Sequence, residues 1–414
     1  MPAFHAAEVN TSNQHLYMQA PGVPHCAQRA RPRPASPAMS SEVRRVLVTG
    51  AAGGVGKEVV APRPRPASPA MSSEVRRVLV TGAAGRVGKE VVARLAKAGD
   101  FVVRAATRGD GAYARSLGAH EVVQWDLEDA STWGPAMEGV THLFSSTQDK
   151  YIAQHMDFAK FCGEHHAGSL QHIVRVCTFG AETNTAAYDD ATHVSRSGAA
   201  IPLMLQHYWW SEECFLRAGF GDRLTSLRGN FYMNHLLKNE LGRIREEGAF
   251  ASPLGDTKNS FVACNDMGEA AAVVLAEGAA RHGDKAYDIC GAAPQSMAEV
   301  AATLTEALAT PLAREVVPDV AGKAVRYEPQ DVAQFEADFG ATRAEFFEYL
   351  RNGFYSRSSP CFYNLTGHRP LSYYEYLTTE GAAGDTGLAE LFSDQGALYT
   401  KGQDLFKGLQ DVKR

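Results

Sequence analysis

The sequence has no apolar run that approaches the roughly 20 residues needed to cross a lipid bilayer, so no membrane-spanning segment is predicted. It has no CxxC pair either. Its seven cysteines are dispersed along 414 residues, which is typical of reduced, buried thiols in an intracellular protein. The net charge of −6 gives no excess of positive charge with which to bind nucleic acid or an anionic membrane. The paired His165 and His166 are interpreted as a solvated helix end, and no metal site is predicted. We therefore expect a cytoplasmic protein that acts on a small molecule.

Acidic residues are nearly missing from residues 1–41, where Glu8 is the single one. This segment is rich in proline, alanine, serine and arginine and shows no apolar periodicity, which predicts disorder. It lacks the apolar stretch of about 7–15 residues that marks a secretory signal. Its low acidity would also suit an organelle transit peptide, and this alternative for localisation stays open.

A catalytic residue pair is missing as well. None of the fifteen tyrosines is followed by a lysine four residues later. Dehydrogenases that act on alcohols use such a Tyr-x-x-x-Lys pair, in which the lysine lowers the pKa of the tyrosine that handles the proton. Oxidation of an unactivated alcohol is therefore disfavoured, whereas reduction of a quinone, enone or iminium needs less help with the proton.

One stretch of the sequence occurs twice. Residues 31–61 and 63–93 are identical except that Gly54 in the first copy corresponds to Arg86 in the second. Such close identity indicates a recent tandem duplication or an error in the gene model, because structural repeats diverge while keeping only key positions. Met71, in the second copy, is a candidate start of the folded chain.

The two copies differ in the residues after their glycines. In the first copy the helix is cut after Ala61 by PRPRP, since proline cannot continue a helix. In the second copy the helix continues as VGKEVVARLAKAGD, with its apolar residues on one face and Gly99 as its predicted end. We therefore assign the working site to the second copy.

The glycines of the second copy, Gly82, Gly85 and Gly88, lie between a predicted strand (RRVLVTG) and this helix. A glycine-rich turn from a strand into a helix lets a backbone approach a diphosphate and directs the helix N-terminus at it. Further strands alternate with helices, which predicts an α/β protein with a doubly wound parallel Rossmann sheet and a smaller C-terminal α+β lobe. The expected strands span residues 101–108, 120–127, 140–147 and 172–180.

The end of the second strand indicates which dinucleotide is bound. NAD sites place an acidic residue there for the ribose hydroxyls. Here Arg108 follows the strand, and a guanidinium suits the 2′-phosphate of NADP. Asp110 lies two residues later and would serve ribose instead, so NADP(H) is favoured and NAD(H) stays an alternative.

Several blocks of the sequence resemble the NmrA-like branch of the atypical short-chain dehydrogenase/reductase superfamily, over about residues 73–380. They are VLVTGAAGRVGKEVV, VVRAATR, HIVRVCTFGAE, HYWWSEECFLRAGFGDRLTSLRGNFYMNHLL and NLTGHRPLSYYEYL. The resemblance implies an NADP(H)-binding Rossmann domain with a small C-terminal lobe over the nicotinamide. That branch includes NADPH-dependent quinone reductases, a reductase of ergot alkaloid synthesis, and redox-sensing regulators without known turnover.

The resemblance also implies roles for residues at matched positions. The diphosphate would contact the glycine turn, the 2′-phosphate would contact Arg108, and other residues would flank the adenine, the adenosine ribose and the nicotinamide. In that order, the implied contacts are Gly82, Gly85, Arg86, Val87 and Gly88; Arg108; Asp126 and Leu127; Ser145 and Ser146; and Cys177, Thr178 and Phe179.

Candidate proton donors lie on a predicted helix, PLMLQHYWWSEECFLRAGF. His207 and Tyr208 would donate a proton, and Glu212, four residues after Tyr208 on the same face, would orient a partner. The alternative is that this tryptophan-rich helix packs in the core and its polar residues form structural pairs. Asn230 and Asn234 would hold the carboxamide or a substrate carbonyl, or would cap the next helix.

The predicted organisation has four parts: a disordered 1–71 extension with the truncated first copy, a 72–245 dinucleotide-binding domain, a 246–380 substrate lobe that shares strands with the core, and a 381–414 tail that is weakly helical and partly disordered. Asp266 and Ser296 are expected to cap helices. The aromatic residues of 331–380 form either a pocket for a flat acceptor or the core of the lobe.

The predicted function is NADPH-dependent reduction of a quinone-like or conjugated carbonyl or iminium molecule. The alternative is a redox-sensing regulator with a protein partner.

Overall fold

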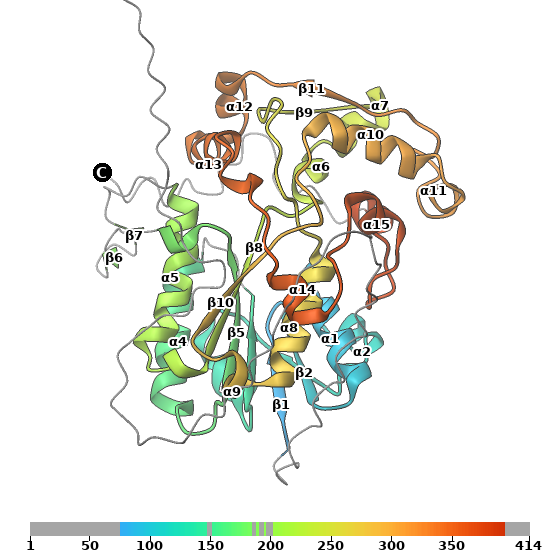
Figure 1. Ribbon diagram of the computed structural model, residues 1–414. Coiled ribbons are helices and arrows are strands. Elements are labelled where there is room, and N and C mark those ends of the chain that lie inside the picture. The colour runs from blue at the N-terminus through green and yellow to red at the C-terminus, as the bar shows by residue number, and fades with distance from the viewer. Residues whose placement is uncertain (1–74, 147–150, 184–187, 190–193, 196–201, 394–414) are drawn as a thin grey trace, which may run out of the picture.

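The computed structural model describes residues 75–146, 151–183, 188–189, 194–195 and 202–393, and at its centre is a seven-stranded parallel sheet (Figure 1). The strand order is β10-β8-β5-β4-β1-β2-β3. The order reverses between β1 and β4, which is where open parallel sheets bind their ligands, at the carboxyl ends of the strands. The strands are β1 (Arg77–Val80), β2 (Val102–Thr107), β3 (Glu121–Gln124), β4 (His142–Ser145), β5 (His172–Thr178), β8 (Leu224–Gly229) and β10 (Lys285–Ile289).

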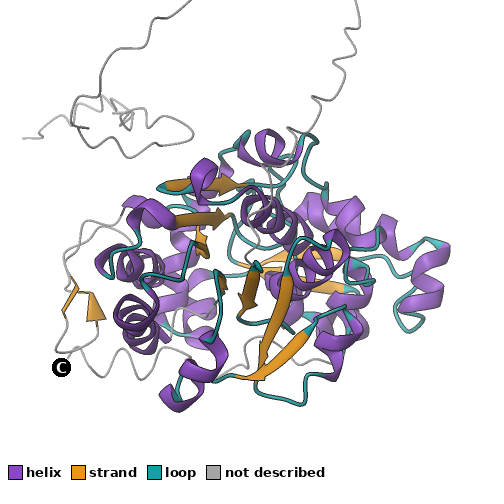
Figure 2. Cartoon of the chain, turned by 90° about the horizontal axis from the view of Figure 1, so that it is seen from below, coloured by secondary structure: helices purple, strands orange, loops and turns teal. Residues whose placement is uncertain are grey.

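Helices cover both faces of this sheet (Figure 2). Alternate residues of a strand point to opposite faces, and in β1 Val78 and Val80 join one buried apolar cluster while Leu79 joins another. The first cluster includes residues of α1 (Arg86–Ala98) and α8 (Cys264–Glu277). The second includes residues of α3 (Trp133–Met137), α4 (Ile152–His166) and α5 (Leu203–Arg217). Burial on both faces explains why the strands are almost continuously apolar.

A smaller lobe lies beyond the carboxyl ends of the strands, at the top of Figure 1. Its two-stranded parallel sheet pairs β9 (Ala249–Ser252) with β11 (Arg326–Pro329). Its main helices are α6 (His235–Asn239), α7 (Leu241–Glu247), α10 (Met297–Leu308), α11 (Pro311–Val316), α12 (Val332–Phe339), α13 (Ala341–Arg351), α15 (Tyr373–Thr378) and α16 (Gly387–Phe392). The remaining helices and strands are α2 (Ala112–Ser116), β6 (Tyr188–Asp189), β7 (Val194–Ser195), α9 (Ala279–His282) and α14 (Cys361–Thr366).

The predicted α/β fold is confirmed, with each expected strand within a few residues of its predicted bounds. Helix α1 ends at Gly99, which adopts the left-handed conformation with φ 77°. Ser296 caps α10 in a reciprocal capping box with Glu299. The first copy of the glycine turn lies outside the described residues. The predicted domain boundary at 245/246 stays a prediction, and the sheet takes β10 from the chain beyond it.

One expectation is wrong. Asp266 does not cap α8. The N-cap position belongs to Ala263, and the buried Asp266 carboxylate accepts a hydrogen bond from the Leu371 backbone N–H at 3.0 Å. Residues 381–393, the first part of the tail that was predicted to be weakly helical, fold against α1 and include helix α16. The rest of that tail lies outside the described residues.

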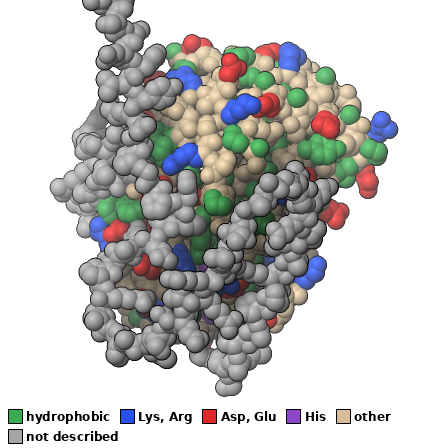
Figure 3. All heavy atoms as spheres, in the orientation of Figure 1, with side chains coloured by type: hydrophobic (Ala, Val, Ile, Leu, Met, Phe, Trp, Pro, Cys, Tyr) green, Lys and Arg blue, Asp and Glu red, His purple; other side chains and the backbone are tan. Residues whose placement is uncertain are grey.

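The surface gives no sign of a single-charge patch on the face drawn in Figure 3, where basic and acidic side chains are interspersed among the described residues. Among the residues that the structure describes, no helix combines the length and apolar character that a membrane crossing requires.

Two buried histidines lie side by side near the amino ends of β4 and β5. The rings of His142 and His172 are 6.2 Å apart, and both side chains are almost fully buried. His172 Nε2 is hydrogen-bonded to Thr225 Oγ1 at 2.9 Å, and His142 Nδ1 to Thr141 Oγ1 at 2.9 Å. Burial, and then the charges of neighbouring groups such as Arg76, lower the pKa of each histidine from 6.5 to about 3. Both rings are therefore neutral in the folded protein at neutral pH.

We expect these two histidines to make the protein less stable in mild acid. The unfolded chain binds their protons near pH 6.5 and the folded protein only near pH 3, so stability falls as the pH drops through 6.5. Between pH 7 and pH 6 the free energy of unfolding should fall by about 1–2 kcal/mol. His172→Gln should flatten the pH dependence in urea unfolding, whereas His165→Gln, at an exposed position, should not. An unchanged slope in His172→Gln would contradict this account.

Candidate functional site

The turn from β1 into α1 is held by close backbone contacts at its glycines. Gly82 adopts a left-handed conformation with φ 63°, and its carbonyl accepts a hydrogen bond from the Gly85 N–H at 2.8 Å. A Cβ on Gly88 would overlap the Gly82 carbonyl oxygen and come within 2.7 Å of the carbonyl carbon. A side chain at Gly88 would therefore push the first turn of α1 off the loop.

The N-terminus of α1 lies directly after this glycine turn. Gly85 is its N-cap, no side chain caps it, and its first turn holds no acidic residue. Thr81 ties this turn to the end of β4, because its Oγ1 donates to the Phe144 carbonyl at 3.1 Å and accepts from the Ser146 N–H at 2.9 Å. The positive end of a 13-residue helix thus lies at the switch point of the sheet. The tight glycine turn and the uncapped amides fit the diphosphate of a dinucleotide.

The other residues implied for the adenosine half follow the neighbouring strands. Arg108 is exposed just after β2, and its carbonyl accepts from Gln124 Nε2 at 3.3 Å. The Asp110 carboxylate, by contrast, accepts from the Ala112 N–H at 3.0 Å, at the start of α2. Asp126 is half-buried, its Oδ1 accepting from the Glu128 N–H. Among the implied residues that are buried are Val87, Leu127 and Ser145.

The three residues implied at the nicotinamide differ in exposure. Cys177 is buried, its Sγ donates to the Tyr208 carbonyl at 3.3 Å, and burial raises the pKa of its thiol. Phe179 is also buried and packs edge-on against Tyr355. Thr178 is half-buried, with its Oγ1 hydrogen-bonded to Tyr355 Oη at 3.2 Å. Thr178 is thus the least buried of the three.

The candidate proton donors on α5 sit in a structural setting. His207 is fully buried and Tyr208 is half-buried. The Glu212 carboxylate accepts two hydrogen bonds from Arg228 of β8, at 2.9 and 2.8 Å, and both side chains are buried. Glu212 and Arg228 therefore form a buried ion pair that joins α5 to β8. A catalytic role for His207 or Tyr208 stays a prediction.

The two candidate asparagines are both buried, and they differ in their bonding. Asn230 is committed on both sides, since its Nδ2 donates to the Tyr355 carbonyl and its Oδ1 accepts from the Phe231 N–H. Asn234 is the N-cap of α6 but makes no side-chain capping bond. Its Nδ2 donates to Glu390 at 2.5 Å, and its Oδ1 has no hydrogen-bond partner within the described part of the chain.

An aromatic hollow of about 580 Å³, part of it open to solvent, lies between α5, α6 and the α12–α13 pair. The aromatic residues of 331–380 therefore form both a pocket wall and part of the lobe core. His235 lines the hollow. Burial, and then the charges of Arg86 and Arg343, lower the pKa of His235 to about 3, so the ring is neutral at neutral pH. The five phenylalanines of the lining are Phe231, Phe335, Phe339, Phe346 and Phe347.

A model of the NmrA-like family matches residues 74–339. The chain belongs to the NmrA-like family. An NAD(P)H azoreductase of Xenophilus azovorans is 31% identical over 221 residues, which cover 53% of this chain and 70% of that protein. Among solved structures, an NADPH-dependent quinone oxidoreductase from Escherichia coli complexed with NADPH is similar with a TM-score of 0.55 and 23% identity, over 72% of this chain and 97% of that one.

Two further solved structures have the same fold. Triphenylmethane reductase of Citrobacter sp. with NADP(H) is 20% identical with a TM-score of 0.53, covering 72% of this chain and 98% of that one. NmrA, a negative transcriptional regulator in complex with NADP, is 16% identical with a TM-score of 0.53, covering 77% and 97%. The fold is thus shared by enzymes and by a regulator.

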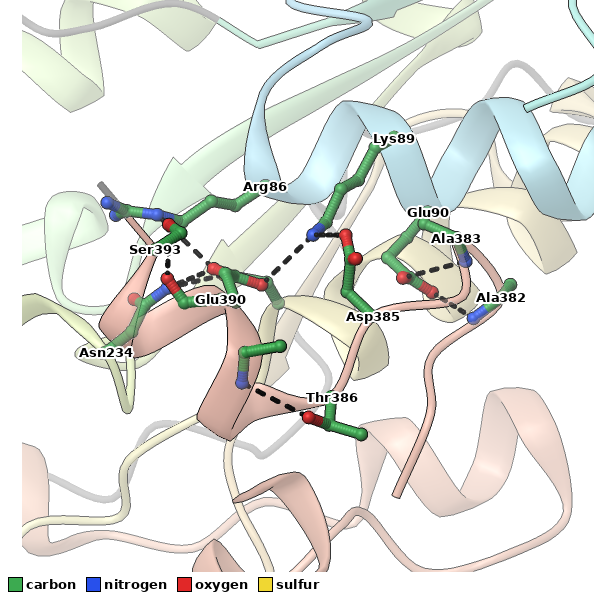
Figure 4. A network of polar contacts seen from close by, with 12 residues as sticks. Arg86, Lys89, Glu90, Asn234, Ala382, Ala383, Asp385, Thr386, Glu390 and Ser393 are labelled. Atoms are coloured by element: carbon green, nitrogen blue, oxygen red, sulfur yellow. Dashed lines mark hydrogen bonds and ion pairs between the residues drawn. The ribbon is translucent and has the colours of Figure 1, made fainter. Parts of the chain in front are cut away.

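A second group of residues reaches the α1 N-terminus from beyond the part of this NmrA-like chain that the family model matches. We call residues 381–393 the C-terminal strap. Its Glu390 forms ion pairs with Arg86 Nε at 3.3 Å and Lys89 Nζ at 3.3 Å, and its Asp385 pairs with Lys89 Nζ at 2.9 Å (Figure 4). Burial alone would lower the pKa of Lys89, but the carboxylates of Glu390 and Asp385 raise it above its usual range.

The sequence reasoning missed both the strap and Tyr355. The sequence does indicate Lys89, because this residue lies three positions after Arg86 and therefore shares its face of the helix. No local signal marks Asp385 or Glu390. The sequence of residues 381–393 does not indicate that these side chains bond to a residue nearly 300 positions earlier in the chain. Tyr355 likewise bonds Thr178 and the Phe179 carbonyl from a separate segment.

Proposed function

We propose that this NmrA-like protein is an NADPH-dependent reductase that delivers hydride directly to a flat, conjugated acceptor such as a quinone, a conjugated carbonyl or an iminium. The observation that carries the proposal is the uncapped N-terminus of α1 behind the Gly82–Gly85–Gly88 turn at the switch point of the sheet. The azoreductase and the quinone oxidoreductase among its relatives support the same class of chemistry.

The chain's own residues would hold the dinucleotide along the carboxyl edge of the sheet. Backbone amides of the glycine turn and the first turn of α1 would bind the diphosphate, and Thr178 would border the nicotinamide end. Arg108, exposed after β2, would pair with the 2′-phosphate, since the neighbouring Asp110 carboxylate is engaged at the start of α2. NADPH, when bound, supplies the hydride, so the protein need only bind, orient and exclude water.

The aromatic hollow is the proposed binding site of the acceptor. Its phenylalanines offer ring faces against which a flat, conjugated molecule can stack. Among the described residues that line it, none is a strong proton donor: His235 is neutral, and the chain has no Tyr-x-x-x-Lys pair. An acceptor that is already electrophilic suits such a site, because the proton can come from water after hydride transfer.

The test is NADPH binding by the full chain, followed by NADPH consumption with a panel of quinones, enones and azo dyes. Turnover with at least one flat acceptor is the expected result. Tight NADPH binding without turnover of any acceptor would instead favour the second candidate, a redox-sensing regulator that passes its cofactor state to a protein partner. That candidate is favoured by the commitment of Cys177, Glu212 and Asn230 to structural hydrogen bonds.

Arg108→Ala should separate the two dinucleotides. We expect a loss of NADPH affinity of about tenfold to 100-fold, since the guanidinium would make charge-assisted bonds to the 2′-phosphate. NADH affinity should change little. The measurement is a pair of fluorescence titrations, with Arg115→Ala, a neighbouring exposed arginine on α2, as the control. An equal loss of affinity for both dinucleotides would refute the assignment of Arg108 to the 2′-phosphate.

A further inference from the structure

The C-terminal strap is seated on the first two turns of α1 by specific contacts. The buried Glu90 carboxylate accepts hydrogen bonds from the backbone N–H groups of Ala382 at 2.9 Å and Ala383 at 3.2 Å. Thr386 then caps α16 by accepting from the Ala389 N–H, which fixes the direction of this short helix. The strap is therefore a folded element aimed at the α1 N-terminus, with Glu390 at its inner end (Figure 4).

The strap directs two carboxylates at two cations of α1. Arg86 is the first residue of α1 and Lys89 the fourth, so both belong to the turn at which we place the diphosphate. Glu390 contacts both cations, and its own side chain is only 11% exposed. Asp385 adds a second carboxylate on Lys89. These carboxylates neutralise the two cations that would otherwise attract a dinucleotide diphosphate to this end of the helix.

We propose that the strap is a built-in competitor of the cofactor: Glu390 and Asp385 hold Arg86 and Lys89 in the free protein, and a bound dinucleotide displaces them. This inference rests on the proposed function, because it takes the α1 N-terminus as the diphosphate site. Diphosphate and strap cannot both stay, since two sets of negative charge would then meet around the same partly buried cations.

Asn234 gives a second, independent sign of an alternative state. Its Nδ2 is bonded to Glu390, while its buried Oδ1 is left without a donor within the described residues. A buried acceptor without a donor is costly. A hydroxyl of a bound dinucleotide would supply the missing donor. The cofactor-bound state would therefore give Asn234 Oδ1 the hydrogen bond that it lacks when the strap is in place.

The test compares NADPH titrations of the wild-type chain and Glu390→Gln, with Glu306→Gln as a matched control at an exposed position on α10. Gln is isosteric with Glu and keeps an acceptor for Asn234, so the fold should be retained, which a thermal melt verifies. We expect Glu390→Gln to bind NADPH about tenfold more tightly, which is about 1.4 kcal/mol. The control should match the wild type. Unchanged or weaker binding by a folded Glu390→Gln chain would overturn the proposal, because Glu390 would then orient Arg86 or merely join the lobes.

Hydrogen exchange gives a second readout. If the strap only held the lobes together, NADPH would not lower the protection of its backbone amides. On addition of NADPH, the backbone amides of Ala382, Ala383 and Ala389 should lose protection as the strap leaves α1. Greater protection of these amides would overturn the proposal. Binding by Glu390→Gln where the wild type binds weakly would support it. If neither chain binds any dinucleotide, the proposed function itself is wrong and the competitor role falls with it.

Discussion

Gly88→Ala is expected to abolish NADPH binding, with a loss of affinity of at least about 100-fold. The added methyl group would overlap the Gly82 carbonyl oxygen and approach the Ala83 Cα to 3.1 Å. These are backbone atoms, so no side chain can move aside to make room. The first turn of α1 must shift away from the loop, and its amides would no longer point at one diphosphate. Fluorescence titration with NADPH measures the loss.

Two control variants separate this effect from a general cost of replacing glycine. Gly134→Ala, in α3, adds a methyl group that meets no atom within 4 Å outside its own stretch of backbone, so binding should match the wild type. Gly56→Ala changes the equivalent glycine of the first sequence copy and should also leave binding intact. Retained binding in Gly88→Ala, or lost binding in Gly56→Ala, would show that the working diphosphate turn was assigned to the wrong copy.

Much of the Rossmann half could be predicted because its signals are local. The strand before Gly82 and the helix after Gly88 are each specified within a few residues, and proline decides against the first copy within the same range. Gly99 ends α1 and Ser296 starts α10 for equally local reasons. A parallel sheet then follows from the alternation of strands and helices.

The rest depends on contacts between distant segments. Asp266 has the right residue type for a cap, but burial against Leu371 gives it a different partner. Glu212 was expected either to orient a partner or to form a structural pair, and the helix alone could not identify Arg228 of β8 as the residue that it bonds. The strap is the largest omission, since its composition resembles a linker and only its contacts with Lys89 and Glu90 reveal it.

The buried Glu212–Arg228 pair leads to the second large effect. Glu212→Met is expected to lower the free energy of unfolding by about 3–5 kcal/mol. The variant removes a carboxylate that is 2% exposed and leaves the Arg228 guanidinium, itself 6% exposed, with Glu182 at 3.5 Å as the ion-pair partner that remains. A buried guanidinium that loses its two short hydrogen bonds to a carboxylate and keeps one ion pair at 3.5 Å is only partly compensated, and burying such a charge is costly. Urea unfolding of the single variant measures the loss.

The double variant Glu212→Met/Arg228→Met decides whether this pair is structural or catalytic. Replacing both charges by apolar side chains of similar length removes the desolvation cost together with the attraction, so most of the lost stability should return. A structural pair also predicts that NADPH affinity and the kcat of any turnover survive in the double variant. If Glu212→Met were as stable as the wild type but lost kcat at unchanged KM, the carboxylate would belong to the chemistry, and the pair would not be structural.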